Sequence, residues 1–140
     1  PLERTGVLLE AAPGFMLVVS YNPGYQNLLK GMKPSTRQRF VALRFDYPTP
    51  EVEQQILIKE TGADAHLAFK LVELASALRK LEQNDLDEVA STRLLIYAAR
   101  MISSGMNALD VCRCCLAEPL SDDPQTVKAL MDVAKIYFDE

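Results

Sequence analysis

Residues 64–81 read DAHLAFKLVELASALRKL, and this stretch determines how most of the chain must be organised. Its leucines recur at spacings of four and three residues, which places them on one face of an α-helix. Asp64 stands where a helix N-cap residue is expected. The pattern predicts a long amphipathic helix whose apolar seam other helices must cover. The seam consists of Leu67, Leu71, Leu74, Leu78 and Leu81.

Helix start and stop signals flank this stretch on both sides. Proline favours the first turn of a helix, glycine favours the position after its end, and Ser, Asn and Asp favour its N-cap. The second part of the chain is therefore expected to be a helical bundle. Its other predicted helices cover residues 51–61, from Ser91 to about Gly105, from Asn107 through Leu116, and from Asp123-Pro124 onward.

The first third of the chain has a different pattern. Residues 15–20 (FMLVVS) form an apolar run between turn signals, and residues 41–45 (VALRF) are rich in strand-forming side chains. Both runs predict strands, but two strands cannot cover their own apolar faces. We therefore expect them to belong to a larger sheet that this sequence does not contain. The predicted class is α+β, with two strands in residues 1–48 followed by a mainly helical part in residues 49–140.

Composition excludes several classes of protein. The chain has 140 residues, of which 49% are hydrophobic, and its net charge is −4. This apolar content argues against a disordered regulator, and scattered basic residues argue against nucleic acid as a partner. The apolar run at residues 15–19 is far shorter than the roughly 18 to 20 residues of a membrane helix, so membrane insertion is not expected. We expect a cytoplasmic protein.

The cysteines form a tight group, Cys112, Cys114 and Cys115. A zinc site usually needs four ligands, and only the distant His66 could help to complete one. On a helix, Cys112 and Cys115 share a face while Cys114 points elsewhere. This spacing favours core packing over metal or redox chemistry.

No self-contained active site is evident, but polar features at three places could bind an anion. Asn22 follows the first predicted strand, where an amide can orient a water molecule or a phosphate oxygen; the simpler interpretation is turn chemistry. Arg37 and Arg39 lie in a short polar segment and could contact a phosphate, or belong to a solvated basic turn. If that segment is helical, they point about 200° apart and cannot serve one phosphate together.

Arg93 follows Ser91 and Thr92 at a predicted helix start, where two hydroxyls, free amides and a guanidinium could form an anion site. The alternative is an ordinary Ser cap followed by a surface arginine.

Taken in order along the chain, these features belong to a set of motifs with a family resemblance. The motifs are residues 20–26 (SYNPGYQ), 29–40 (LKGMKPSTRQRF), 45–48 (FDYP), 91–95 (STRLL) and 118–123 (EPLSDD). Together they resemble the C-terminal half of the CbbQ/NirQ/NorQ group of MoxR-type AAA+ ATPases. The resemblance implies that residues 1–48 are the C-terminal part of the AAA+ α/β core and that residues 49–140 are its helical lid.

The same resemblance implies a role for each candidate residue. Asn22 would be the sensor-1 residue that positions the attacking water. Arg39 would be the arginine finger that reaches a neighbouring subunit's nucleotide, with Arg37 as the alternative. Arg93 would be the sensor-2 residue, which is carried on the lid and closes on the phosphates.

At the level of the whole protein, the resemblance implies an ATPase that uses ATP and Mg²⁺ in a ring, typically a hexamer. Such a ring would act with a von Willebrand factor A-domain partner to remodel and activate a client metalloenzyme, either Rubisco or nitric oxide reductase. The Walker A and Walker B motifs do not occur in these 140 residues. We therefore expect part of a longer protein, which by itself neither holds ATP tightly nor hydrolyses it.

An alternative of a different class is a non-enzymatic helical module that docks a partner protein through its apolar seam. Such a module has no need of Arg39 and Arg93, whereas an ATPase loses turnover when either is replaced. In either case, strands without sheet neighbours leave unpaired edges. We expect the chain to associate through them or to rearrange them.

Overall fold

The computed structural model describes residues 6, 10–20, 33–81 and 90–138. The chain divides into two compact units, Pro1–Arg44 and Phe45–Glu140, which are described separately below.

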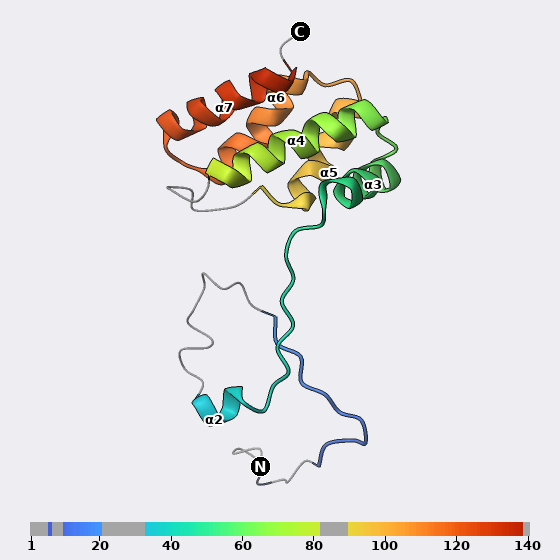
Figure 1. The fold of residues 1–140 in the computed structure, drawn as a ribbon, viewed down its shortest axis with the longest axis vertical. Helices are drawn as coiled ribbons and strands as arrows, with labels where there is room; N and C mark the ends of the chain where they lie inside the picture. Colours follow the sequence, from blue (N-terminus) through green and yellow to red (C-terminus); the bar gives the residue numbers. More distant parts are fainter. Residues whose placement is uncertain (1–5, 7–9, 21–32, 82–89, 139–140) are drawn as a thin grey trace. The chain divides into compact units, whose positions relative to one another are not determined.

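The second unit is a helical bundle built around one long helix (Figure 1). This helix, α4 (Ala65–Leu81), contacts α3 (Pro50–Thr61), α5 (Thr92–Ser103) and α7 (Pro124–Phe138). A short helix, α6 (Ala108–Cys112), packs against α5 and α7. The contacts bury one continuous apolar core, which includes Leu57, Leu71, Leu74, Leu78, Leu95, Val111, Leu116, Leu120, Leu130 and Ala134.

The predicted helix boundaries are largely confirmed. Gly62 ends α3 in the left-handed conformation, with φ 71°. The Asp64 carboxylate accepts a hydrogen bond from the Leu67 amide at 2.8 Å, and the Asn107 side chain accepts bonds from the first amides of α6. Leu81, at the last position of α4, is half exposed, so the buried seam is one turn shorter than predicted.

The fourth helix differs from its prediction. Instead of one α-helix through Leu116, α6 ends at Cys112 and continues as a π-helical turn, Arg113–Ala117, and a 3-10 turn, Glu118–Leu120. Pro119 lies in the last of these turns and has no amide hydrogen to donate to a regular α-helix. Leu116, Ala117 and Leu120 are all buried, so the irregular turns still supply the core.

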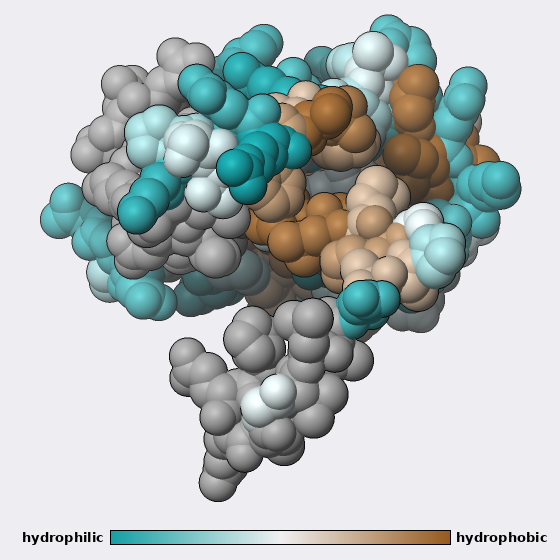
Figure 2. Space-filling view, turned by 90° about the horizontal axis from the view of Figure 1, so that it is seen from below, coloured by the Kyte–Doolittle hydropathy of each residue, from teal (hydrophilic) through white to brown (hydrophobic). Residues whose placement is uncertain are grey.

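The described residues of the first unit include a short helical turn, α2 (Pro34–Arg37). Within its described residues no strand is formed, and the side chains of residues 15–19 and 41–44 are exposed, as is that of Phe45 at the start of the second unit. The two-strand part of the predicted fold therefore stays a prediction. In the space-filling view, hydrophobic residues lie at the surface beside hydrophilic ones (Figure 2).

Candidate functional site

Arg93 lies in the first turn of α5, with its side chain exposed. The opposite face of the helix is anchored in the core by Leu95, Ala98 and Ala99. The first turn of α5 contains no acidic residue of its own, so the Arg93 guanidinium adds to the positive end of the helix dipole. This is an electrostatic setting that favours an anion.

Ser91 and Thr92 turn out to have different environments. Ser91 precedes the helix in an extended conformation, and its carbonyl oxygen accepts the Leu94 amide at 3.0 Å. The Thr92 hydroxyl donates a 2.6 Å hydrogen bond to Oε1 of Glu53. The expectation that both hydroxyls face a common anion is therefore wrong for Thr92, because a buried carboxylate takes up its hydroxyl.

Glu53 on α3 is almost completely buried, with 1% of its surface exposed. Arg79 on α4 donates to both of its carboxylate oxygens, from Nη1 and Nη2, at 2.8 Å each. Burial raises the pKa of the Glu53 carboxyl, but the hydrogen bonds from Arg79 and Thr92 and the charge of Arg79 outweigh it and lower the pKa overall. The ionised form is therefore the stable one in the folded chain.

Arg79 also reaches beyond this ion pair. Its Nε donates to the carbonyl oxygen of Ala90 at 2.8 Å, two residues before the start of α5. Its guanidinium carbon lies 3.9 Å from the ring centroid of Tyr47, a stacked cation–π arrangement. We call these five residues, Tyr47, Glu53, Arg79, Ala90 and Thr92, the Glu53 cluster. They come from α3, α4, the segment before α3 and the start of α5.

The structure gives less information about the other predicted site residues, Arg37, Arg39 and Asn22. Arg37 is the last residue of α2, and Arg39 follows in the turn, with its amide donating to the Thr36 carbonyl oxygen at 3.1 Å and its side chain exposed. Asn22 lies outside the described residues. Arg39 belongs to the first unit and Arg93 to the second, and the roles of these residues stay predictions.

The cysteines follow the packing interpretation. Cys112 is buried in the core, Cys115 is half buried with its sulfur 3.4 Å from that of Met101, and Cys114 is exposed. Burial, helped by Cys115, raises the pKa of the Cys112 thiol to about 12. Burial also raises the pKa of Cys115. All of these cysteines are free thiols. In the described part of the chain, no cluster of His, Cys, Asp and Glu could hold a metal ion.

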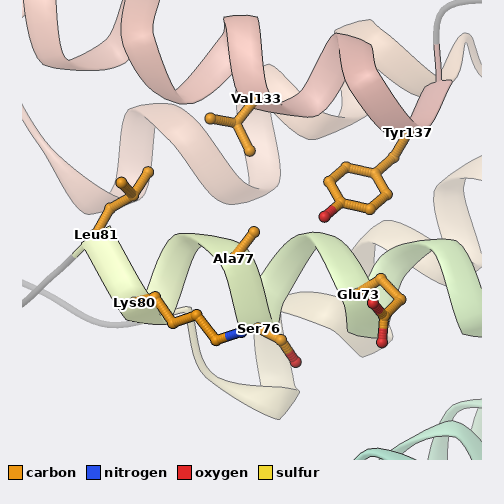
Figure 3. Close-up of a pocket in the computed structure, with 7 residues that line it drawn as sticks. All are labelled: Glu73, Ser76, Ala77, Lys80, Leu81, Val133 and Tyr137. Atoms are coloured by element: carbon orange, nitrogen blue, oxygen red, sulfur yellow. The ribbon is translucent and has the colours of Figure 1, made fainter.

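A groove of about 320 Å³ runs between α4 and α7 (Figure 3). Val133 and Tyr137 point from α7 toward α4, and Ala77 points back from α4. The predicted site residues are not among the residues that line it, which are Glu73, Ser76, Ala77, Lys80, Leu81, Val133 and Tyr137.

Comparison with known proteins places the helical bundle in a family. The family model described as "CbbQ/NirQ/NorQ C-terminal" matches residues 53–137, which span the helical bundle from Glu53 to Tyr137. The chain belongs to this family. It is thus a member of the CbbQ/NirQ/NorQ group of MoxR-type AAA+ proteins and matches the C-terminal part of that group.

Relatives in the group extend the match over nearly the whole chain. The "Denitrification regulatory protein NirQ" of Stutzerimonas stutzeri is 69% identical over 137 residues, which are 98% of this chain and 50% of that protein. "Protein NorQ" of Paracoccus denitrificans is 51% identical, over 99% of this chain and 51% of that protein. "Protein CbbQ" of Hydrogenophilus thermoluteolus is 49% identical, over 99% and 52%. The chain therefore spans about half the length of these relatives.

Among the described helices, none has both the length and the apolar composition needed to cross a lipid bilayer.

The Glu53 cluster was not foreseen from the sequence, although one signal for part of it was present. Glu53 precedes the buried Leu57 by four residues, so both lie on the same face of α3. An acidic residue on a core-facing stripe predicts a buried partner of opposite charge. The sequence does not indicate that the partner is Arg79.

Proposed function

We propose that this chain forms the nucleotide-sensing edge and the lid of an AAA+ ATPase that activates a client metalloenzyme of denitrification. The observation that carries the proposal is Arg93: an exposed guanidinium in the first turn of α5, with no acidic residue in that turn, within a family of AAA+ ATPases. In a non-enzymatic module this arrangement is a local electrostatic cost, whereas a bound phosphate converts it into a favourable interaction.

The residues at the start of α5 fit a nucleotide phosphate. Arg93 and the neighbouring backbone amides would hold it, since both are donors that suit an anionic oxygen. ATP with Mg²⁺ supplies the transferable phosphoryl group when bound. The Walker A and Walker B motifs would come from a preceding half, in keeping with relatives twice as long as this chain. The chain by itself is then inactive.

The first unit would complete the core in the intact protein. We propose that residues 15–20 and 41–45 pair there with strands of the preceding half, with Asn22 as sensor 1 and Arg39 as the finger that reaches the next subunit of a hexameric ring. Arg37 is the alternative finger. The exposed apolar side chains of both segments support this, because strands within a larger sheet covered by helices would bury them.

We infer the client enzyme from the sequence identities between this chain and its relatives. Two NirQ proteins are 69% and 67% identical to the chain, compared with 51% for NorQ and 49% for CbbQ. Because the NirQ proteins are described as denitrification regulatory, we favour nitric oxide reductase over Rubisco as the client, with a von Willebrand factor A-domain protein as the adaptor.

The test is ATP turnover by the intact protein, in which this chain follows its phosphate-binding half. We expect Arg93→Ala and Arg39→Ala each to lower kcat by about 10²-fold or more, because each guanidinium stabilises charge in the transition state. Arg100→Ala is the matched control: Arg100 lies on the same helix as Arg93, is exposed, and bonds only the Glu60 carbonyl oxygen among the contacts described. It should retain turnover.

A mixing experiment tests the finger separately. Subunits with Arg39→Ala keep an intact nucleotide pocket, while subunits lacking the phosphate-loop lysine still carry a finger. Mixed rings should therefore regain activity that neither variant has alone. If both arginine variants retain full turnover, the ATPase assignment of these residues is wrong and the helical interaction module is favoured.

A further inference from the structure

The chain entering α5 is held on both sides of Ser91. The Ala90 carbonyl accepts from Arg79 Nε at 2.8 Å, and the Thr92 hydroxyl donates to Glu53 at 2.6 Å. Ala90 is buried and Thr92 is half buried, whereas Arg93 directly after them is exposed. The backbone just ahead of Arg93 is thus attached to α3 and α4 at two points.

These two attachments leave the side chains of Glu53, Arg79 and Thr92 little freedom to move. The Glu53–Arg79 pair is bidentate, and both side chains are largely buried, with 1% and 13% of their surfaces exposed. A buried fork of this kind fixes the orientation of both partners, and its charge-assisted bonds are stronger than neutral ones. Thr92 has a short side chain with little rotamer freedom, so its bond to Glu53 also fixes the first residue of α5.

We infer that Glu53 is a positioning residue for Arg93 and acts through Thr92. Glu53 is buried beneath the start of α5, and it sets the direction in which the first turn of α5 presents the guanidinium. This inference rests on the proposed role of Arg93 in nucleotide sensing. Displacing a catalytic group by about 1 Å can cost up to 10²-fold in rate, so loss of the attachment should be visible in turnover.

Thr92→Val is the decisive variant, since removing the Glu53 carboxylate would leave Arg79 without its partner and could unfold the bundle. Valine has nearly the shape of threonine but lacks the hydroxyl. In the intact ATPase we expect Thr92→Val to lower kcat/KM for ATP about tenfold at a temperature where circular dichroism shows a folded protein. Thr92→Ser keeps the hydroxyl and should restore turnover to within about twofold of the wild type.

Thr126→Val is the matched control. The Thr126 hydroxyl also donates to a carboxylate near a helix start, to Asp123 Oδ2 at 2.8 Å ahead of α7. Its loss removes the same kind of bond in another helix. We expect Thr126→Val to lower the thermal midpoint while leaving kcat/KM unchanged, so a purely structural effect is separated from positioning.

A double-mutant cycle completes the test. Positioning through Arg93 requires that Thr92→Val cause no further loss in an Arg93→Ala background, whether measured as turnover or as the Kd of a fluorescent ATP analogue. The same loss in both backgrounds, or no loss while Arg93 is present, overturns the inference and leaves the proposed function intact. If Arg93→Ala itself retains full turnover, both the sensor role and the positioning role fall.

Discussion

At the scale of single residues, the buried carboxylate of Glu53 has the most demanding environment in the described part of the chain. Its oxygens accept hydrogen bonds from Arg79 at 2.8 Å and from Thr92 at 2.6 Å. A charge removed from water is tolerated only when it is paired and hydrogen-bonded. Glu53 meets that condition only while α3, α4 and the start of α5 are all in place.

This environment predicts how stability depends on pH. The pKa of Glu53 is lower in the folded chain than the ordinary value of about 4.3 expected after unfolding. The stabilisation by the ionised form is therefore complete above about pH 4.3 and is lost as the pH falls through the folded value. Urea unfolding between pH 7 and pH 3 should show the free energy of unfolding decreasing below about pH 4.

Replacing Glu53 tests this assignment. Glu53→Gln should cost about 3 kcal/mol at pH 7, because Arg79 keeps its charge without a charged partner. Its stability should also vary less with pH in the acid range than that of the wild type. Glu60→Gln, at the exposed end of the same helix, should follow the wild-type curve. Parallel curves for wild type and Glu53→Gln would mean that another group governs the acid transition.

At the scale of helices, the sequence was a good guide wherever a boundary depends on a local signal. Pro50, Gly62, Asp64, Asn107 and Pro124 each act through backbone or capping interactions within a few residues, so their effect can be read from neighbouring positions. The π-helical turn at Arg113–Ala117 could not be read in this way, because its apolar residues match an α-helical stripe equally well.

Gly62 gives a test of one such boundary. Its φ of 71° favours glycine, and a Cβ added there would meet no atom within 4 Å apart from its chain neighbours. The cost of Gly62→Ala is therefore conformational alone, about 1 to 2 kcal/mol. Thermal unfolding should show a lower midpoint for Gly62→Ala, and Gly62→Asn should lose less, because asparagine tolerates this conformation better. Equal losses would point to a different cause.

At the scale of the whole molecule, the two units differ in how far the sequence alone defines them. Residues 50–138 contain the side chains that bury one another, so their bundle was predictable from periodicity and caps. Residues 15–20 and 41–45 have strand-forming composition, but a strand requires a neighbour, and no described residue supplies one. Similarly, Glu53 and Arg79 are separated by 26 residues, and no local signal joins them.

Hydrogen exchange should reveal this difference. In the 140-residue chain, amides of residues 15–20 and 41–45 should exchange quickly, because they lie outside any helix or strand. Joined to its preceding half, the same segments should become protected by about 10²-fold or more as they enter a sheet. Amides in the middle of α4 are the internal control and should be protected in both proteins. Fast exchange that persists in the intact protein would contradict the assignment of these segments to the AAA+ core.

The stacking of Tyr47 on Arg79 connects two segments of the chain that lead into different helices. Tyr47 belongs to the segment that leads into α3, and the same guanidinium donates a hydrogen bond to the Ala90 carbonyl oxygen. One side chain therefore contacts both the segment that leads into α3 and the backbone that leads into α5, so a displacement of either contact would change the surroundings of the other. Arg79 thus links two segments that are far apart in the sequence, one through a tyrosine ring and the other through a peptide oxygen.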